Sequence, residues 1–548
     1  MPERPLEGIH IAESPDAEQP IARVSAQSTA FVGRTLRGPV NRPVAVRSFA
    51  DYQQVFGALW QPSPLSYAVE HFFEQGGRRA IIVRVVNNAA PVSISLRCEQ
   101  QTLTLEAIAP GTREFLRASV DYDNIAADDE ERFNLVVQRV RSPGSERIEM
   151  QETFRGLSIN PDSPRFAPQV LLESQLVRVR GTLPRQRPDR TLMPGTNLPI
   201  GYVNSNPDGD DGRPLTDYDV IGSAARGTGL FALQSIDDIA FVYIPPLCRA
   251  HDVGVSTLLV AAKFCRDKRA ILIVDSPTAW DTSTHATQGL NNLGFHSDNA
   301  VMFYPRIVAM DRLRGRQEIF PNGGAVAGLL SRTGDAMSAA LAVTEPEPLL
   351  RGAAKLATHV STADRWRLAA HGANALQTVR SPDPQRPALR TLACGASASP
   401  DGSYLAQRRF ALFVLDAIER GTRWCLAAAR DHSLWDRLTR QIRSFFLDLR
   451  NAGAFSSVEE HQAFLVICDE RINDPQGAAD TVKILIQFAA LHGGGNHSYL
   501  IEHSIRGATI RSVIVNRLES SILVSDELEQ EITIRLDRHD ERVRYIAG

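Results

Sequence analysis

The stretch between Arg408 and Gly453 organises the chain, because its pattern of apolar and polar positions predicts two amphipathic helices. Apolar residues of the first helix recur at i, i+3, i+4, i+7 and i+8, as Phe410, Phe413, Val414, Ala417 and Ile418. Gly421 is expected to end this helix, since glycine adopts the left-handed conformation readily. Ser433, with Asp436 three residues later, is expected to begin the second helix.

The second helix is predicted to have two different faces. Its apolar stripe consists of Trp435, Leu438, Ile442, Phe445, Phe446 and Leu449. Arginines project from the other side, at Arg437, Arg440, Arg443 and Arg450. Two interpretations of this arginine row stay open: it is a solvated surface, or it presents positive charge to a partner while the apolar stripe anchors a core.

The N-terminal residues 1–20 are predicted as an arm. Leu6–Glu13 has the pattern of a short strand, with Ile9 and Ile11 on one face, and prolines at positions 5, 15 and 20 isolate it from its neighbours in the sequence. Because a lone strand is unstable in water, this arm, with Ile21 added to its apolar set, is expected to pair with a distant part of the chain or with another copy. A frayed terminus is the alternative.

The C-terminal end shows a similar pattern. Residues 531–536 read EITIRL, an amphipathic strand candidate whose apolar positions are Ile532, Ile534 and Leu536. We therefore predict that both ends of the polypeptide are β segments whose partners belong to other copies.

Residues 28–86 and 237–304 alternate helical stretches with buried strands, which is the pattern of an α/β domain. Their strands are apolar runs without alternation, and such runs favour a parallel sheet that is covered on both faces. A middle α/β domain is therefore predicted from residues 21–86 and 200–390.

Residues 87–180 differ, because they contain period-2 strands joined by polar or Gly/Pro connections. They predict a small β domain inserted into the middle domain. Residues 181–199 are rich in proline and arginine and are predicted as a linker.

The C-terminal third is predicted to be α+β, with the two helices on a mostly antiparallel sheet over residues 400–508 and an extension or arm over residues 509–548. The expected fold class is thus multidomain α/β and α+β. It has a βαβ-type middle domain, an inserted small β domain, and an α+β C-terminal domain completed by interchain strands.

Composition excludes several functional classes. The chain has 548 residues, too many for one core, and its 43% hydrophobic and 22% charged residues are typical of a soluble globular protein. A net charge of -3 favours neither nucleic acid nor anionic lipid as a partner. No signal peptide or membrane-spanning run is recognised, and the six cysteines form no C-x-x-C pair, which favours reduced thiols in a cytoplasmic product.

No convincing active site emerges from the motifs. The Gly-rich stretches at 209–212 and 322–328 lack the lysine and the context of a phosphate loop. A metal at His492 and His497 lacks a third ligand with suitable local spacing. The best enzyme hypothesis places a site at the carboxyl ends of the 239–275 strands, with His251, Asp252, Asp275 and Ser276. No cofactor is expected.

Several segments, in this order, resemble the contractile tail sheath family of bacteriophages and phage-tail-like injection machines. They are residues 28–57, 66–86, 152–179, 211–222, 227–246, 264–280, 408–424 and 464–473, and they span nearly the whole chain. The chain departs from the family near its end, where HGGGNHSYLIEHSI is followed by residues 506–548.

The resemblance implies a structural subunit, not an enzyme, that stacks in hexameric rings around an inner tube and contracts to drive the tube through a target envelope. It implies that the C-terminal domain faces the tube, which makes Arg437, Arg440 and Arg443 candidate tube contacts, and that terminal arms add strands to neighbouring subunits. The implied partners are other copies, the tube protein, and baseplate and tail-end cap proteins, without nucleic acid or membrane insertion. Assembly is expected in the bacterial cytoplasm. Another virus-like structural protein, such as a capsid or tube component, is a further alternative.

Overall fold

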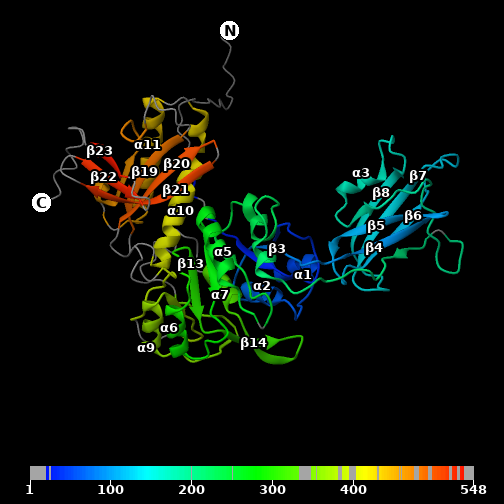
Figure 1. The fold of residues 1–548 in the computed structure, drawn as a ribbon, viewed down its shortest axis with the longest axis horizontal. Helices are drawn as coiled ribbons and strands as arrows, with labels where there is room; N and C mark the ends of the chain where they lie inside the picture. The colour runs from blue at the N-terminus through cyan, green and yellow to red at the C-terminus, as the bar shows by residue number, and fades with distance from the viewer. Residues whose placement is uncertain are drawn as a thin grey trace, which may run out of the picture. The chain divides into compact units, whose positions relative to one another are not determined.

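The structure is a computed structural model, and its described residues form two compact units (Figure 1). The described residues are 20–23, 26–198, 200–249, 251–332, 347–352, 354–380, 385–393, 403–428, 431–455, 457, 459–473, 481–490, 496–505, 507–517, 521–526 and 531–535. Residues 26–332 and 347–393 make up the larger unit. The smaller unit holds residues 20–23 and everything described from residue 403 onward.

A seven-stranded sheet forms the centre of the larger unit, in the order β17-β13-β12-β11-β1-β3-β2. All neighbouring strands are parallel except β2, which runs antiparallel to β3 at one edge. The strands are β1 (Thr29–Gly33), β2 (Val44–Val46), β3 (Ala80–Arg84), β11 (Phe241–Tyr243), β12 (Ile271–Asp275), β13 (Ala300–Tyr304) and β17 (Ala373–Ala375). The parallel sheet predicted from the apolar runs is therefore present.

Helices cover both faces of this sheet. Along β1 the two faces alternate, since Phe31 packs against Phe72 of α2 while Val32 belongs to the core beneath α5. One face carries α2 (Pro64–Glu74) and α7 (Gly323–Arg332), and the other carries α4 (Asp217–Ile221), α5 (Val255–Lys268), α6 (Ser283–Asn291) and α9 (Thr362–Ala370). Burial on both faces is the reason that these strands show no apolar–polar alternation.

The inserted β domain consists of two small sheets around one apolar core. One sheet holds β4 (Pro91–Cys98), β5 (Gln101–Pro110) and β9 (Val177–Arg180). The other holds β10 (Val203–Asn204), β6 (Leu116–Asp121), β7 (Arg132–Val140) and β8 (Ile148–Ser158). A short helix, α3 (Ala167–Val170), closes one side of this core.

The prediction of a linker over residues 181–199 is wrong for the part that the structure describes. The Tyr122 hydroxyl donates to the Pro188 carbonyl at 2.7 Å, and Thr191 N donates to the Val120 carbonyl at 3.0 Å. Further on, β10 pairs with β6. The segment binds the β domain because the edge of β6 exposes backbone groups that need partners, so the inserted domain extends past its predicted end at residue 180.

A separate hairpin sheet follows β13. It contains β14 (Ile307–Asp311), β15 (Arg316–Phe320) and the short β16 (Lys355–Leu356), all antiparallel. The hairpin packs beside α2, where the Tyr67 and Phe320 rings lie 5.0 Å apart.

The smaller unit places two helices, α10 (Leu405–Thr422) and α11 (His432–Asn451), on a six-stranded antiparallel sheet. The strands follow each other in chain order: β18 (Phe464–Ile467), β19 (Thr481–Ala489), β20 (Asn496–Ser504), β21 (Gly507–Arg517), β22 (Ser521–Asp526) and β23 (Glu531–Arg535). Residues from 509 onward were predicted as an extension, but β21, β22 and β23 continue the same sheet, since each pairs with the strand before it.

Two helix boundaries also differ from the prediction. Gly421 does not end the first helix: α10 runs to Thr422 and a 3-10 turn follows. Gly421 is needed for close packing instead, since a Cβ there would lie 2.8 Å from the Ile21 side chain. The second helix begins at His432 and is capped by Asp431 rather than Ser433, because the Asp431 carboxylate accepts from Leu434 N at 2.9 Å.

Candidate assembly surfaces

The apolar stripe of α11 is buried as predicted. All six predicted residues are at most 3% exposed, and they join α10 and the strands β18 to β20 in one core. Phe446 lies at its centre, with its ring stacked on Phe464 at 5.0 Å and tilted against Phe488 at 5.8 Å. This core fixes the orientation of α11, so that the face of the helix opposite the apolar stripe points to solvent.

Arg437, Arg440 and Arg443 all lie exposed on that opposite face. The Arg437 guanidinium stacks over the Trp424 ring at 4.6 Å, and Arg443 Nε donates to Glu460 Oε1 at 2.5 Å. The arginine row is therefore partly ordered by local contacts and still open to solvent. A contact between this row and an inner tube stays a prediction.

The predicted N-terminal arm lies mostly outside the described residues, and Ile9 and Ile11 are among those not described. Ile21 is described and packs into its own chain, 6% exposed in the core of the smaller unit and against Gly421 of α10. Arg23 pairs with Asp448 of α11 at 2.7 Å. The assignment of Ile21 to an interchain contact is corrected, because α10 offers it an apolar site within the same chain.

The C-terminal strand candidate is β23, and it pairs within its own chain. Ile532 lies opposite Val524 and Ile534 opposite Ile522 in the neighbouring β22, while Leu536 lies outside the described residues. Among the described residues no strand pairs with the outer edge of β23. Within the described residues β23 is thus the last strand of its sheet, with one side paired, and its part in strand addition between copies stays a prediction.

The hypothesised enzyme site at the carboxyl ends of the parallel strands is occupied by structural contacts. Asp275 accepts from the Tyr243 hydroxyl at 2.6 Å and from Gly323 N at 2.8 Å, and burial raises its pKa to about 6. Asp252 pairs with Arg306 at 2.6 Å and accepts from Thr278.

Two further residues of that hypothesis lie close by. His251 is exposed, with its Nδ1 3.4 Å from the Cys248 sulfur, and Ser276 is buried. Asp275 therefore accepts from the first residue of α7, and Asp252 fixes the loop that contains Thr278. Neither carboxylate accepts a hydrogen bond from a histidine among the described residues.

The Gly-rich and histidine-rich stretches have packing roles where they are described. Gly324 of α7 lies against α2, where a Cβ would come within 2.3 Å of the Ala68 carbonyl. His497 is buried and stacks on Phe488 at 5.3 Å, and burial lowers its pKa to about 4. His492 lies outside the described residues. Among the residues that the structure covers, no group of three metal-ligating side chains occurs, and no helix is long and apolar enough to cross a membrane.

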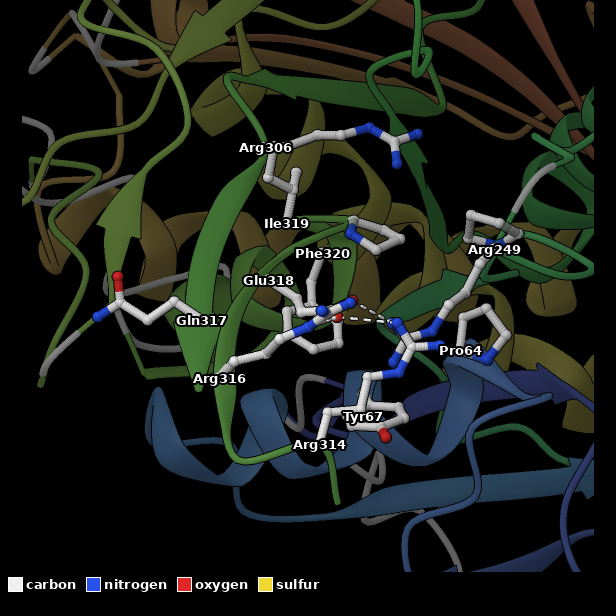
Figure 2. Close-up of a pocket in the computed structure, with 12 residues that line it drawn as sticks. Pro64, Tyr67, Arg249, Arg306, Arg314, Arg316, Gln317, Glu318, Ile319 and Phe320 are labelled. Carbon is white, nitrogen blue, oxygen red and sulfur yellow. Dashed lines mark hydrogen bonds and ion pairs between the residues drawn. The ribbon is translucent and has the colours of Figure 1, made fainter. Parts of the chain in front are cut away.

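An arginine-lined pocket of about 590 Å³ lies between the β14–β15 hairpin and α2, and motif analysis missed it (Figure 2). Arg249, Arg314 and Arg316 all donate to the Glu318 carboxylate, at 2.5, 2.8 and 2.7 Å. Hydrogen bonds from Arg314 and Arg316 lower the pKa of Glu318 to about 2. The only signal in the sequence is the basic turn DRLRGRQ at 311–317.

Asp311 anchors the turn end of this hairpin. Its side chain is fully buried, accepts from Arg249 at 2.8 Å and from the Tyr67 hydroxyl at 3.1 Å, and keeps a lowered pKa despite its burial. Arg249 precedes Asp311 by 62 residues, so only the fold brings the pair together. The Asp311 and Glu318 carboxylates are therefore largely buried beneath the hairpin, while the Arg316 side chain is exposed to solvent.

Comparison with known proteins gives matches in structure only. No protein-family model matches the chain, and no curated protein matches it. The sheath tail protein from Listeria innocua matches with a TM-score of 0.59 at 12% identity, over 89% of this chain and 96% of that one.

The sheath tail protein from Desulfitobacterium hafniense matches with a TM-score of 0.51 at 13% identity, over 91% of this chain and all of that one. The sheath of an extracellular contractile injection system, in its contracted state, gives a TM-score of 0.49 at 11% identity, over 89% and 95% of the two chains. The first two comparisons confirm the resemblance read from the sequence at the level of the fold: this chain has the fold of contractile tail sheath proteins.

Proposed function

We propose that the chain is the structural subunit of a contractile sheath, which polymerises as stacked hexameric rings around an inner tube. Contraction of the sheath drives the tube through a target envelope. The observation that supports this most is the likeness to the Listeria innocua sheath tail protein over 89% of the chain, which includes the middle, inserted and C-terminal parts together.

The smaller unit supplies the elements that such a subunit needs. Its two helices and sheet form one well-packed core, and α11 presents an exposed arginine row on the side away from that core. Its last strand, β23, offers an outer edge without a partner among the described residues. We assign the arginine row to the tube and the edge to strand addition between copies, with residues 1–20 as the donated arm.

Single exposed charge pairs contribute only about 0–1 kcal/mol each. Weak contacts of this kind suit a tube interface that has to be released during contraction. In this proposal subunits rotate as nearly rigid bodies during contraction, while strand addition keeps the copies linked. Contraction is driven by the apolar surface that becomes buried between copies in the contracted state. Assembly takes place in the bacterial cytoplasm, with baseplate and cap proteins at the ends.

Negative-stain electron microscopy of the purified chain tests the proposal. Wild-type protein is expected to form long tubes or stacked rings, whereas a variant that lacks residues 1–20 is expected to fold and to form none. Since Ile21 packs in its own chain, the deletion stops before this residue. Protein that stays monomeric or dimeric at every concentration and salt condition would contradict the sheath role.

An enzyme with a site near Asp275 is the second candidate. Its support is the position of His251, Asp252 and Asp275 at the carboxyl ends of parallel strands. Asp275→Asn and His251→Ala would then abolish turnover of some substrate without affecting polymers. In a sheath subunit the same variants are expected to change stability alone.

A further inference from the structure

The turn of the β14–β15 hairpin is an exposed surface that combines positive charge with apolar side chains. We call it the basic hairpin and define it by Met310, Arg312, Leu313, Arg314, Arg316 and Ile319. Its three apolar residues are 52–62% exposed, and the side chains of Arg312 and Arg316 are 66% and 68% exposed. Exposed apolar residues mixed with arginine are typical of protein interfaces.

The acids that pair with the basic hairpin lie mainly beneath it. The side chains of Asp311, Glu70 and Glu318 are 0%, 7% and 14% exposed, while Glu74 is half-exposed. The exposed part of the hairpin therefore consists of arginine and apolar side chains, and the carboxylates that balance its charge, apart from Glu74, are buried beneath it. A surface arranged in this way fits a partner that brings carboxylates from outside.

The inserted domain carries a surface of the opposite sign. The connection between β6 and β7 contains Asp128, Asp129, Glu130 and Glu131, which we call the acidic turn. Within the described part of the chain, Asp128 and Glu130 are exposed and make no side-chain hydrogen bond or ion pair. No ion pair among the described residues joins the acidic turn to the basic hairpin.

The chain segment that contacts the acidic turn leads into a loop with exposed apolar side chains. Arg187 donates to the Asp129 and Arg132 carbonyls and stacks over Tyr122, which ties the segment after β9 to the turn. That segment continues into a loop whose large apolar residues are about half-exposed: Leu192, Met193, Leu198 and Ile200. The basic hairpin thus offers exposed arginines, and the acidic turn offers exposed carboxylates that have no partner among the described residues.

We propose that the basic hairpin of one copy binds the acidic turn of a second copy. The two surfaces differ, so a contact made once per pair leaves one basic hairpin and one acidic turn free for further copies, and repeats head-to-tail into rings or helical stacks. This inference rests on the proposed sheath function. It adds a contact between copies that the middle and inserted domains make, separate from the strands and arms of the smaller unit.

A cross-link between two singly substituted chains tests the contact directly. Arg316→Cys and Glu130→Cys chains are mixed, oxidised and run on a non-reducing gel. Both chains also carry Cys248→Ser and Cys394→Ser, because Cys248 is partly exposed and Cys394 lies outside the described residues, while Cys98, Cys265, Cys425 and Cys468 are buried. A mixed disulfide is expected to form at least about tenfold faster than for the control mixture of Arg226→Cys with Glu130→Cys, whose arginine is exposed elsewhere in the middle domain. Equal rates would overturn the proposal.

A charge swap tests the same contact in polymers. Asp128→Lys with Glu130→Lys is expected to raise the lowest polymerising concentration about tenfold, through repulsion from the hairpin. Adding Arg312→Glu and Arg316→Glu is expected to restore it. The proposal would be contradicted if the lysine variant polymerised at the same concentration as the wild-type protein. It would also be contradicted if the swapped chain kept the wild-type circular dichroism spectrum but did not recover polymerisation. If wild-type protein forms no polymer at all, the sheath function fails, while the cross-link in solution still decides on the contact.

Discussion

The middle sheet and the sheet of the smaller unit differ in how their faces are covered and in the length of their edge strands. The seven-stranded sheet is covered by helices on both faces and ends in two strands of three residues each, β17 and β2. The antiparallel sheet packs one face on α10 and α11, carries a small second apolar cluster on the other face, and ends in the five-residue β23. Short edge strands discourage pairing with another chain, whereas a longer, alternating edge strand permits it.

The comparison teaches which part of the molecule is completed by its own chain. In the middle domain Asp275, at the end of β12, is paired internally with Tyr243 and Gly323. In the smaller unit the core is equally apolar, and the arginine row of α11 is open to solvent. Each unit therefore has a core of its own, and the arginine row is an exposed charged face of the smaller unit.

The largest expected effect separates the stability of the two units. Phe446→Ala removes a ring from the core of the smaller unit, and Phe31→Ala removes one from between β1, α2 and β11. Both rings are fully buried, so each change is expected to lower the free energy of unfolding of its own unit by about 3–5 kcal/mol. Differential scanning calorimetry is expected to show two transitions, with each variant shifting one.

The matched pair also provides the control. If Phe446→Ala and Phe31→Ala shift the same single transition equally, the two units unfold together, and the prediction of two independent cores is wrong.

A smaller effect is expected from acid. Burial lowers the pKa of His497 in the smaller unit to about 4, below the ordinary value of 6.5. A neutral buried histidine contributes stability that is fully present above pH 6.5 and is lost as the pH falls towards 4. Lowering the pH from 7 to 5 is therefore expected to cost the smaller unit about 2 kcal/mol.

The middle domain is expected to respond less to the same change. His71 is buried with a pKa of about 4 and acts in the same direction as His497. Asp275, whose pKa is raised to about 6, acts in the opposite direction, since its stability contribution is present at low pH and is lost as the pH rises through 6. Calorimetry at pH 7 and pH 5 checks this difference. His497→Gln is expected to flatten the response of the smaller unit alone, and an unchanged response would contradict the role of His497.

The smallest effect on stability is expected at the arginine row. Reversing the charge at Arg437, Arg440 and Arg443 together is expected to change the free energy of unfolding by no more than about 1 kcal/mol, because all three are exposed. Co-sedimentation with the tube protein is expected to be lost. Arg226→Glu, at an exposed position of the middle domain, is the control. Unchanged co-sedimentation of the triple variant would remove the arginine row from the tube interface.

Local patterns predicted much of the fold. The α11 stripe and the parallel middle strands follow from spacing within a few residues, since the side chains of one element decide which of its faces is buried. The predicted start of α11 was less accurate, because Ser433 and Asp431 are both good N-cap residues and the helix is capped by Asp431. The basic hairpin was missed because its geometry depends on Arg249 and Asp311, which are far apart in the sequence.

By itself the sequence determined the type and order of the elements, the apolar stripes that form the cores, and the likeness to contractile sheath proteins, because these depend on short-range periodicity and on the order of segments. Only the tertiary structure decided which strands are neighbours, such as Thr29 opposite Phe241 in β1 and β11, and that Ile21 belongs to the core of the smaller unit. It also placed arginines outside and carboxylates beneath in the basic hairpin. Contacts of this range form only when the chain has closed loops of many residues, and no local pattern records which loop will close.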